Sequence, residues 1–284
     1  MPLKDIFLHA DSGGDYKTRL ETAVNLAAAH KAHLTAVYIP TLPKEHEVEG
    51  HPRQDPAASE VFLGETPRRD LPDTERNKRV MSDAYQRVLD DAEKAKALFE
   101  DQAGRAGVSH EWVYDESPML DALALHARFC DLLVITQPTR KDTPEQLILT
   151  LGLPVLVVPN KGRFPVVGQR ILIAWDRSPV ALRAVNNART FLRPAAEVKA
   201  LSINLEPIYR GTVAGSGIIE HLARHDIKAT RLRVTAENAR LSDVILSSAR
   251  QEKSDLILMG AYGKRGLRER ILGGVTSYVI SDTT

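Results

Sequence analysis

The sequence predicts an α/β protein built from two tandem open parallel-sheet domains of the Rossmann-like, doubly wound type. Two observations lead to this fold class. Short apolar strand patterns rich in Val, Ile and Leu alternate with helical patterns, which is typical of parallel sheets covered by helices on both faces. The order of these patterns also repeats, so the two halves of the 284-residue chain follow one plan.

The repeat starts at the first strand of each half, which is a short apolar run that ends in an aspartate and a serine. A helical pattern and a second strand follow, and a later apolar strand occurs in both halves. The matching segments are 4–12 with 169–178, 33–39 with 197–203, and 131–135 with 255–259. After the insertion described below, an apolar stripe from Met81 to Phe99 predicts a further helix in the first half.

A linker at 159–165, punctuated by proline and glycine, predicts two domains, at 1–160 and 166–284. The first domain carries a long insertion at 41–79, rich in proline and charge, which is typical of a surface loop. The apolar run 154–158 should close the first sheet, whereas the second half ends where its counterpart is expected. Either the chain is truncated there or this last strand is dispensable, and an open sheet edge would then need cover.

Composition excludes several classes of protein. The formal net charge is +1, so no strong field favours nucleic acid. The single cysteine, Cys130, excludes an internal disulfide and a cysteine metal site. No apolar run approaches the roughly 20 residues of a membrane helix, and the N-terminus lacks the apolar core of a signal peptide. We therefore expect a cytoplasmic protein without a membrane or nucleic-acid partner.

Glycines near the end of the chain are the strongest functional signal. The apolar run 256–259 ends at Gly260, Gly263 follows, and Gly273 comes after nine intervening residues. Glycines just past a strand let backbone amides approach a phosphate closely, and a helix expected to start near 267–272 would also favour anions. The spacing is neither the dinucleotide fingerprint nor the P-loop. Turn chemistry without any ligand is the alternative interpretation.

Other strand ends of the second half should meet these glycines at one edge of the sheet, the usual ligand site of such folds. Asp176 follows the first strand and can accept hydrogen bonds from a ribose hydroxyl or an adenine amino group. Its alternative role is to cap the next helix, at Asp176 or Ser178. In the nucleotide interpretation Met259 packs near the base or sugar, and Thr276 adds a hydroxyl to the phosphate site.

The glycine spacing resembles the G-x2-G-x9-G-[ST] signature of the universal stress protein family, with Gly274 where a small hydroxyl residue is expected. The halves resemble tandem domains of this family, the second more closely. The resemblance implies an adenine-nucleotide-binding fold, a dimer or tandem pseudo-dimer, and a role in stress tolerance, although the family also has non-binding branches. The nucleotide-binding residues it implies are Ala174, Asp176, Ile203, Met259, Gly260, Gly263, Gly273, Gly274, Val275 and Thr276.

The implied cofactor is ATP or AMP, with or without Mg²⁺, or none if the loop is a relic. Gly274 lacks the hydroxyl but keeps its backbone N–H, so one donor is lost. One ordinary hydrogen bond contributes roughly 0.5–1.5 kcal/mol, so binding would weaken by about tenfold. A homodimer or a protein partner is also consistent with the resemblance.

The first half departs further from the signature. No glycine matches Gly260 or Gly263, Gly152 is followed by Leu153, and the intervening prolines supply no amide donor. Asp11 remains at the strand end. We expect this half not to bind nucleotide in the manner of the family and to serve as the partner in the pseudo-dimer.

Two other functions stay open. One is an interaction module that keeps the fold without the ligand. The other is an adenylating enzyme, because residues 11–16 resemble the S-G-G-x-D-[ST] loop of ATP pyrophosphatases, with one residue and the final hydroxyl missing. No catalytic or metal-binding residue can be named, so any ATP hydrolysis should be slow. His221 and His225 are four residues apart and would share a helix face, without an evident third ligand.

Overall fold

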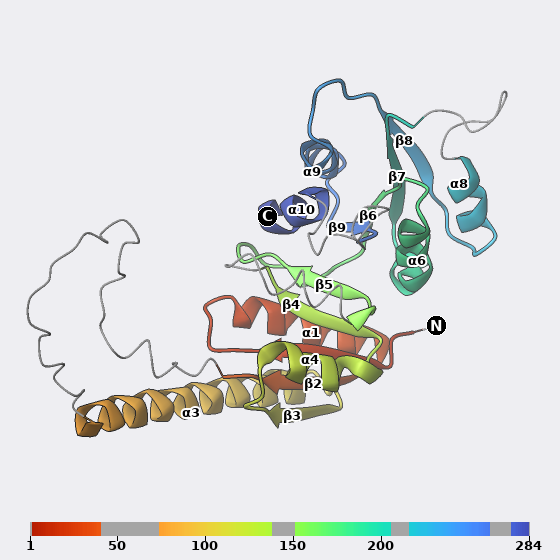
Figure 1. Cartoon of the computed structure of the whole chain (residues 1–284). Coiled ribbons are helices and arrows are strands. Elements are labelled where there is room, and N and C mark those ends of the chain that lie inside the picture. The colour runs from red at the N-terminus through yellow and green to blue at the C-terminus, as the bar shows by residue number, and fades with distance from the viewer. Residues whose placement is uncertain (1, 41–73, 138–150, 206–215, 262–273, 284) are drawn as a thin grey trace, which may run out of the picture.

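The computed structural model describes residues 2–40, 74–137, 151–205, 216–261 and 274–283, and contains two separate parallel sheets (Figure 1). The first has five strands in the order β3-β2-β1-β4-β5, and the second has four in the order β8-β7-β6-β9. All strand pairs are parallel. The predicted fold class, two parallel-sheet α/β domains, is confirmed.

The first half supplies the five-stranded sheet. Its elements are β1 (Asp5–Ala10), α1 (Tyr16–His30), β2 (His33–Tyr38), α3 (Thr74–Arg105), β3 (His110–Tyr114), α4 (Met119–His126), the short 3₁₀ helix η1 (Ala127–Phe129), β4 (Leu132–Thr136) and β5 (Val155–Val158). Because α3 begins at Thr74, the end of the insertion expected at 41–79 is already helical, which corrects that boundary. Residues 41–73 lie outside the described part of the chain.

The second half repeats the same order of elements up to its fourth strand. They are β6 (Arg170–Ala174), α6 (Pro179–Asn187), α7 (Arg189–Leu192), β7 (Glu197–Ile203), α8 (Ser216–Ala223), β8 (Thr230–Val234), α9 (Leu241–Gln251), β9 (Leu256–Met259) and α10 (Gly274–Asp282). β9 is the edge strand, and within the described residues no fifth strand pairs with it.

Alternation along the central strand explains the layers of the first sheet. Leu8 and its neighbours at even positions of β1 pack with α1 and α3, whereas Phe7 packs on the opposite face with Leu123 of α4. Leu8 and Leu123 are fully buried and Phe7 is nearly so. A central strand that is apolar on both faces is what a parallel sheet between two helical layers requires.

The second sheet is covered in the same way. α6 and α8 lie over one face, and α9 with α10 covers the other (Figure 1). Ile171 and Ile173 of β6 point to the first face, and Leu172 to the second. The cluster on the α6 face is continuous with the α1 face of the first half, so one apolar core joins both halves.

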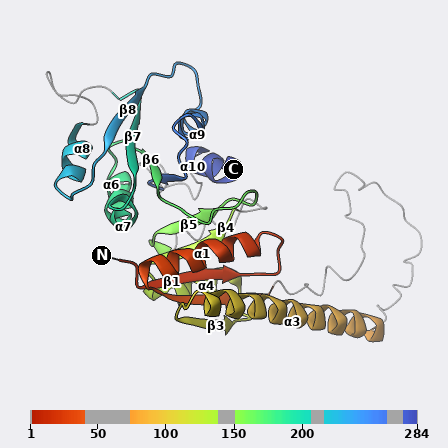
Figure 2. The same cartoon turned by 180° about the vertical axis from the view of Figure 1, so that it is seen from behind.

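Polar contacts also hold the linker against α1 of the first half. The hydroxyl of Thr22 on α1 donates to the carbonyl of Phe164 at 3.1 Å, and the amide of Asn25 donates to that of Pro165 at 2.9 Å. Arg163 forms an ion pair of 2.7 Å with Glu21. Seen from behind, α1 lies along one face of the first sheet, while α3 extends away from both sheets (Figure 2).

No helix in the described ranges combines the length and the apolar character needed to cross a membrane.

An aspartate before the fourth strand ties down the amino end of the first strand in each half. Asp131 accepts hydrogen bonds from the backbone amides of Lys4 and Asp5. Asp255 accepts from three amides, those of Gly168, Gln169 and Arg170, at 2.9–3.1 Å. These bonds hold the amino ends of neighbouring parallel strands in register.

We predict that Asp255→Ala lowers the free energy of unfolding by about 1–2 kcal/mol, because three amides lose a charged acceptor and water replaces it only partly. Urea denaturation followed by circular dichroism measures this. Glu237→Ala is the control, since Glu237 is an exposed side chain in a loop of the same half. Equal midpoints for the two variants would contradict the prediction.

Candidate functional site

The candidate site lies where β6 and β9 end at the carboxyl edge of the second sheet. Ala174 and Met259, the last residues of these strands, are direct partners in the parallel ladder. Asp176 follows two residues after β6 and is exposed. β6 and β9 are also the strands between which the order of the sheet reverses, the position where open α/β sheets usually bind ligands.

The turn between β6 and α6 orients Asp176. Its Oδ1 accepts a hydrogen bond of 2.9 Å from the amide of Ser178. Arg177 between them has φ 66°, in the left-handed region that non-glycine residues rarely occupy. Ser178 is the helix cap, since its Oγ accepts from the amide of Ala181 at 3.1 Å, and Pro179 begins the helix. The capping role expected at Asp176 or Ser178 therefore falls to Ser178.

Gly260 follows β9 and is explained by packing. A Cβ atom at this position would lie 2.6 Å from the backbone nitrogen of Ala181 and 2.7 Å from the carbonyl carbon of Val180. The start of α6 therefore approaches the strand end so closely that only glycine fits. This contact brings the turn that carries Asp176 against the end of β9.

Four of the predicted residues pack against one buried cluster. Ala174, Ile203, Met259 and Val275 surround a core formed by β6, β7, α9 and α10, whose members are Leu172, Leu201, Ile245, Leu246, Ala249 and Val279. All four of these predicted residues are partly buried. Together they form an apolar base beneath the strand ends.

The start of α10 is the part of the phosphate site that the structure describes. Gly274 is the first helical residue, and a Cβ added there would meet no atom of the described residues within 4 Å. Thr276 is only 8% exposed, so its side chain belongs to the packing of the helix, and the predicted hydroxyl contact is not favoured. The donors that this end of the site offers are the backbone amides of Gly274 and Val275, which have no acceptor within the helix. Gly263 and Gly273 lie outside the described residues.

β7 ends at Ile203, and Asn204 follows it. The side chain of Asn204 is bonded in both directions to the backbone of Ala236, donating at 2.8 Å and accepting at 2.9 Å. This pair ties the loop after β7 to the loop after β8. Asn204 is therefore already satisfied, and Ile203 is the residue that could contact a base.

The first half has the same turn, but a buried arginine side chain bonds its strand-end aspartate. Asp11 accepts from the amide of Gly13 at 2.9 Å, as Asp176 does from Ser178. Eight residues after Asp11, the side chain of Arg19 is completely buried and donates to Asp11 Oδ2 at 2.7 Å. The residue eight positions after Asp176 is Ala184, which carries no charge.

His9 and Tyr16 complete this buried group. The Nε of Arg19 donates to the carbonyl of His9 at 2.9 Å, and its guanidinium lies 5.6 Å from the ring centre of Tyr16. Burial, together with the nearby Arg19, lowers the pKa of His9 to about 4, although Asp11 acts in the opposite direction. The strand-end carboxylate of the first half thus serves an internal ion pair, which supports the expectation that this half does not bind nucleotide.

The pyrophosphatase-like segment of residues 11–16 forms the turn into α1. The amide of Tyr16 donates to the carbonyl of Gly13 at 3.0 Å, and Asp15 precedes the helix without a side-chain capping bond. Asp11 is engaged by Gly13 and Arg19. These are the hydrogen bonds of a turn at a helix start, and they do not favour the adenylating enzyme over a structural turn.

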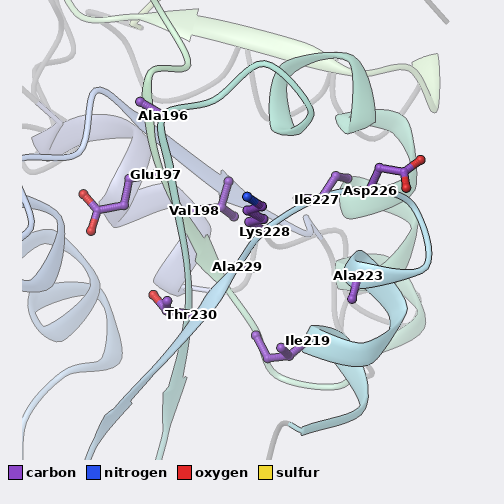
Figure 3. A pocket seen from close by; sticks show the side chains of 10 residues that line it. All are labelled: Ala196, Glu197, Val198, Ile219, Ala223, Asp226, Ile227, Lys228, Ala229 and Thr230. Atoms are coloured by element: carbon purple, nitrogen blue, oxygen red, sulfur yellow. The ribbon is translucent and has the colours of Figure 1, made fainter.

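A pocket of about 610 Å³ lies elsewhere in the second half (Figure 3). It is formed between α8 and the amino ends of β7 and β8, and includes Ile219, Glu197 and Lys228 among its lining residues. This is the edge opposite to Asp176, so the pocket is not part of the candidate nucleotide site.

Metal-binding chemistry finds little support in the described ranges, where no group of three or more His, Cys, Asp or Glu side chains could hold an ion. His221 and His225 do lie close together, with ring centres 4.8 Å apart. Arg189 contacts the ring of His225 at 3.2 Å, and His221 bonds Asn186 at 3.1 Å. A guanidinium at this distance opposes a bound cation.

Arg19 was missed from the sequence, although a signal existed. It lies on the same helical face as Tyr16, Leu20 and Ala23, all of which are buried. A charged residue within an apolar stripe indicates a buried partner of opposite charge. Asp11, eight residues earlier and without a role in the sequence analysis, was a candidate for that partner.

We predict that Gly260→Ala destabilises the protein by about 1–3 kcal/mol, because the new methyl group overlaps the backbone of α6. Gly274→Ala is the matched control, since its methyl group meets open space and alanine favours a helix. Thermal unfolding of both variants measures the difference. A Gly260→Ala protein as stable as Gly274→Ala would show that the close approach is not required.

We also predict that His9 makes stability depend on pH. The unfolded histidine takes up a proton near pH 6.5, whereas the folded one does so only near pH 4. Between these values the unfolded state binds more protons, so stability falls as the pH falls, by up to about 3 kcal/mol. His9→Ala introduces the residue that the second half has at the matching position, Ala174. Its free energy of unfolding, measured by urea denaturation, should depend less on pH than that of wild type. Parallel pH profiles of the two proteins would contradict this.

Comparisons with known proteins give a family for the second half of the chain. The model of the Universal stress protein family matches residues 168–284. No curated protein matches the chain in sequence.

Solved structures match the fold over nearly the full length. A universal stress protein from Archaeoglobus fulgidus DSM 4304 has a TM-score of 0.65 and 14% identity, and the match covers 98% of this chain and 95% of that one. A functionally unknown protein from Pseudomonas aeruginosa PAO1 has a TM-score of 0.54 and 14% identity, with 98% and 89% covered. A universal stress protein in complex with cAMP matches 57% of this chain and 100% of its own, at 15% identity and a TM-score of 0.33.

At these identities the structural matches establish the fold, and the family model identifies the half that carries the candidate site. Residues 168–284 are therefore a domain of the universal stress protein family, in a chain whose full length has the fold of a solved universal stress protein.

Proposed function

We propose that the second half binds an adenine nucleotide, ATP or AMP, outside the carboxyl ends of β6 and β9. The observation that carries this proposal is the exposed carboxylate of Asp176, oriented by Ser178 at the point where the strand order reverses. The matching family model covers this half of the chain. The proposed division into domains at 1–160 and 166–284 assigns the site entirely to the second domain.

The residues present fit a nucleoside. With Oδ1 of Asp176 bonded to Ser178, the carboxylate can still accept from a ribose hydroxyl or an adenine amino group at Oδ2. Ala174, Met259 and Ile203 offer an apolar base for the ring or sugar. The left-handed Arg177 in this turn is an unusual backbone conformation, of the kind that often occurs at binding sites.

The phosphates would be held by backbone amides. The first turn of α10, at Gly274 and Val275, provides N–H groups that have no acceptor within the helix, at the positive end of the helix dipole. Open space next to Gly274 leaves room for a ligand atom. Gly263, Gly273 and Thr276 stay in the proposal as neighbours of the phosphates, with the amide of Thr276 in place of its buried hydroxyl.

The proposed role is a stress-response protein that acts through ligand-dependent conformation or a protein partner, in the cytoplasm. Among the described residues proposed for the site, Asp176 is the only carboxylate, and its Oδ1 accepts a hydrogen bond within a turn. Any hydrolysis of ATP should therefore be slow. The contacts between the halves support an internal pseudo-dimer, and a homodimer remains part of the proposal.

A second candidate function is an interaction module without a nucleotide. Two observations favour it: packing alone explains Gly260, and the side chain of Thr276 is buried. Titration of the purified, nucleotide-free protein with ATP, ADP and AMP by calorimetry separates the candidates. Saturable binding near one nucleotide per chain supports the first, and no heat at millimolar ATP supports the second.

We predict that Asp176→Asn weakens ATP binding by about five- to thirtyfold, because it removes a charged acceptor and keeps the oxygen that bonds Ser178. Calorimetry measures the dissociation constants, and circular dichroism checks the fold. Asp226→Asn is the matched control, an exposed aspartate of the same half that borders the pocket at the opposite edge. Unchanged affinity in Asp176→Asn would remove this carboxylate from the site.

A further inference from the structure

Gln137 connects the first sheet with the last helix of the second half. It is the first residue after β4 and is only 8% exposed. Its side-chain amide donates to the carbonyls of Ile280, at 2.8 Å, and Ser281, both in the last turn of α10. No sequence motif pointed to this contact, which joins positions more than 140 residues apart.

The backbone around Gln137 makes this side chain rigid. The backbone N–H of Gln137 donates to the carbonyl of Val158 at 2.8 Å, and its side-chain Oε1 accepts from the backbone N–H of Asn160 at 3.2 Å. Both partners lie at or just after β5, the edge strand of the first sheet. Each polar group of Gln137 named here therefore has a partner, and its NH₂ group is held towards α10.

The carbonyls that Gln137 bonds are groups that a helix cannot satisfy itself, because its last four carbonyls lack intrahelical donors. α10 is nine residues long, about 13 Å at 1.5 Å per residue. A helix of this length moves as one body, so an anchor at its end also limits movement at its start. That start carries the amides of Gly274 and Val275.

Other contacts hold α10 in a different way. Val279 is part of the apolar cluster with α9, and Tyr278 lies 6.0 Å from the guanidinium of Arg240. Apolar contacts are non-directional, so they keep the helix on its face but resist sliding along its axis only weakly. The hydrogen bonds from Gln137 are directional and set the axial position.

We propose that Gln137 is a positioning residue for the nucleotide site, and that through it the first half tunes the affinity of the second. The proposal rests on the nucleotide-binding function proposed above. Gln137 touches no ligand: it fixes the end of α10 so that the amides at the start stay aligned with the carboxyl edge of β6 and β9. The first half, which we expect not to bind nucleotide itself, thereby contributes to the site of its neighbour.

The test compares Gln137→Met, which keeps the length of the side chain without its donors, with wild type in the full-length protein. We expect the dissociation constant for ATP to rise about three- to tenfold, as for the loss of one or two neutral hydrogen bonds. Gln137→Glu should bind more weakly still at pH 7.5, because a carboxylate repels the two carbonyls, and should recover relative to wild type as it is protonated near pH 5. Thr136→Val is the matched control, since Thr136 bonds Asn160 and not α10.

Hydrogen exchange of the α10 amides, measured without nucleotide, keeps the proposal separate from the proposed function. Faster exchange confined to α10 in Gln137→Met, together with the weaker ATP binding, supports it. Equal affinity and equal exchange in wild type and Gln137→Met overturn it while leaving nucleotide binding intact. No ATP binding by wild type overturns both the proposed function and the nucleotide part of this inference, and the exchange data then decide whether Gln137 anchors α10.

Discussion

Burial of the central strand on both faces is the constraint on which the rest of this structure depends. β1 and β6 are each flanked by strands on both sides and covered by helices above and below. Such a strand carries mostly apolar side chains, with the buried His9 of β1 as an exception, so polar groups gather at the residues just beyond its end. Asp11 and Asp176 occupy that position in the two halves, and each folds back onto the amide two residues later.

The two halves differ in a few side chains that lie beneath the helix after the first strand, which is α1 in the first half and α6 in the second. In the first half His9, Tyr16 and Arg19 fill the space behind the strand-end aspartate, and the guanidinium pairs with its carboxylate. In the second half Gly260 allows α6 to begin against the end of β9, and Ala184 replaces the arginine. An arginine and a glycine are enough to direct one aspartate inwards and leave the other exposed. The different surroundings of the two aspartates follow from local packing.

The features that could be predicted from the sequence are those that depend on the pattern of neighbouring residues, such as strands, helices and the residues that follow a strand. The strand at 197–203 coincides with β7, and the repeated order of elements gives the two parallel sheets, because periodicity and strand length are local properties. The exposed position of Asp176 also follows from its place after an apolar run. The boundary of the insertion was placed too late, since the charged residues that open α3 carry no apolar stripe although they favour a helix.

Features set by contacts between distant residues could not be predicted. Gly260 has a packing role only because Val180 and Ala181, far earlier in the chain, reach the same point. Gln137 lies within a segment noted for its lack of glycine, and its bonds to α10 depend on the arrangement of the two halves. The signature spacing points to a phosphate loop, but it does not reveal which of its residues also serve the packing of the sheet.

The apolar core that continues from the α1 face of the first half to the α6 face of the second has a consequence for folding. Leu20 and Ala27 of α1 belong to the same buried cluster as Phe191 and Leu192 of α7. Separating the halves would expose this surface to water, at a cost proportional to its area. The two sheets should therefore melt in one cooperative transition, and a fragment that contains only the better-matched half would start with one face of its core uncovered. Each half thus covers part of the apolar surface of the other.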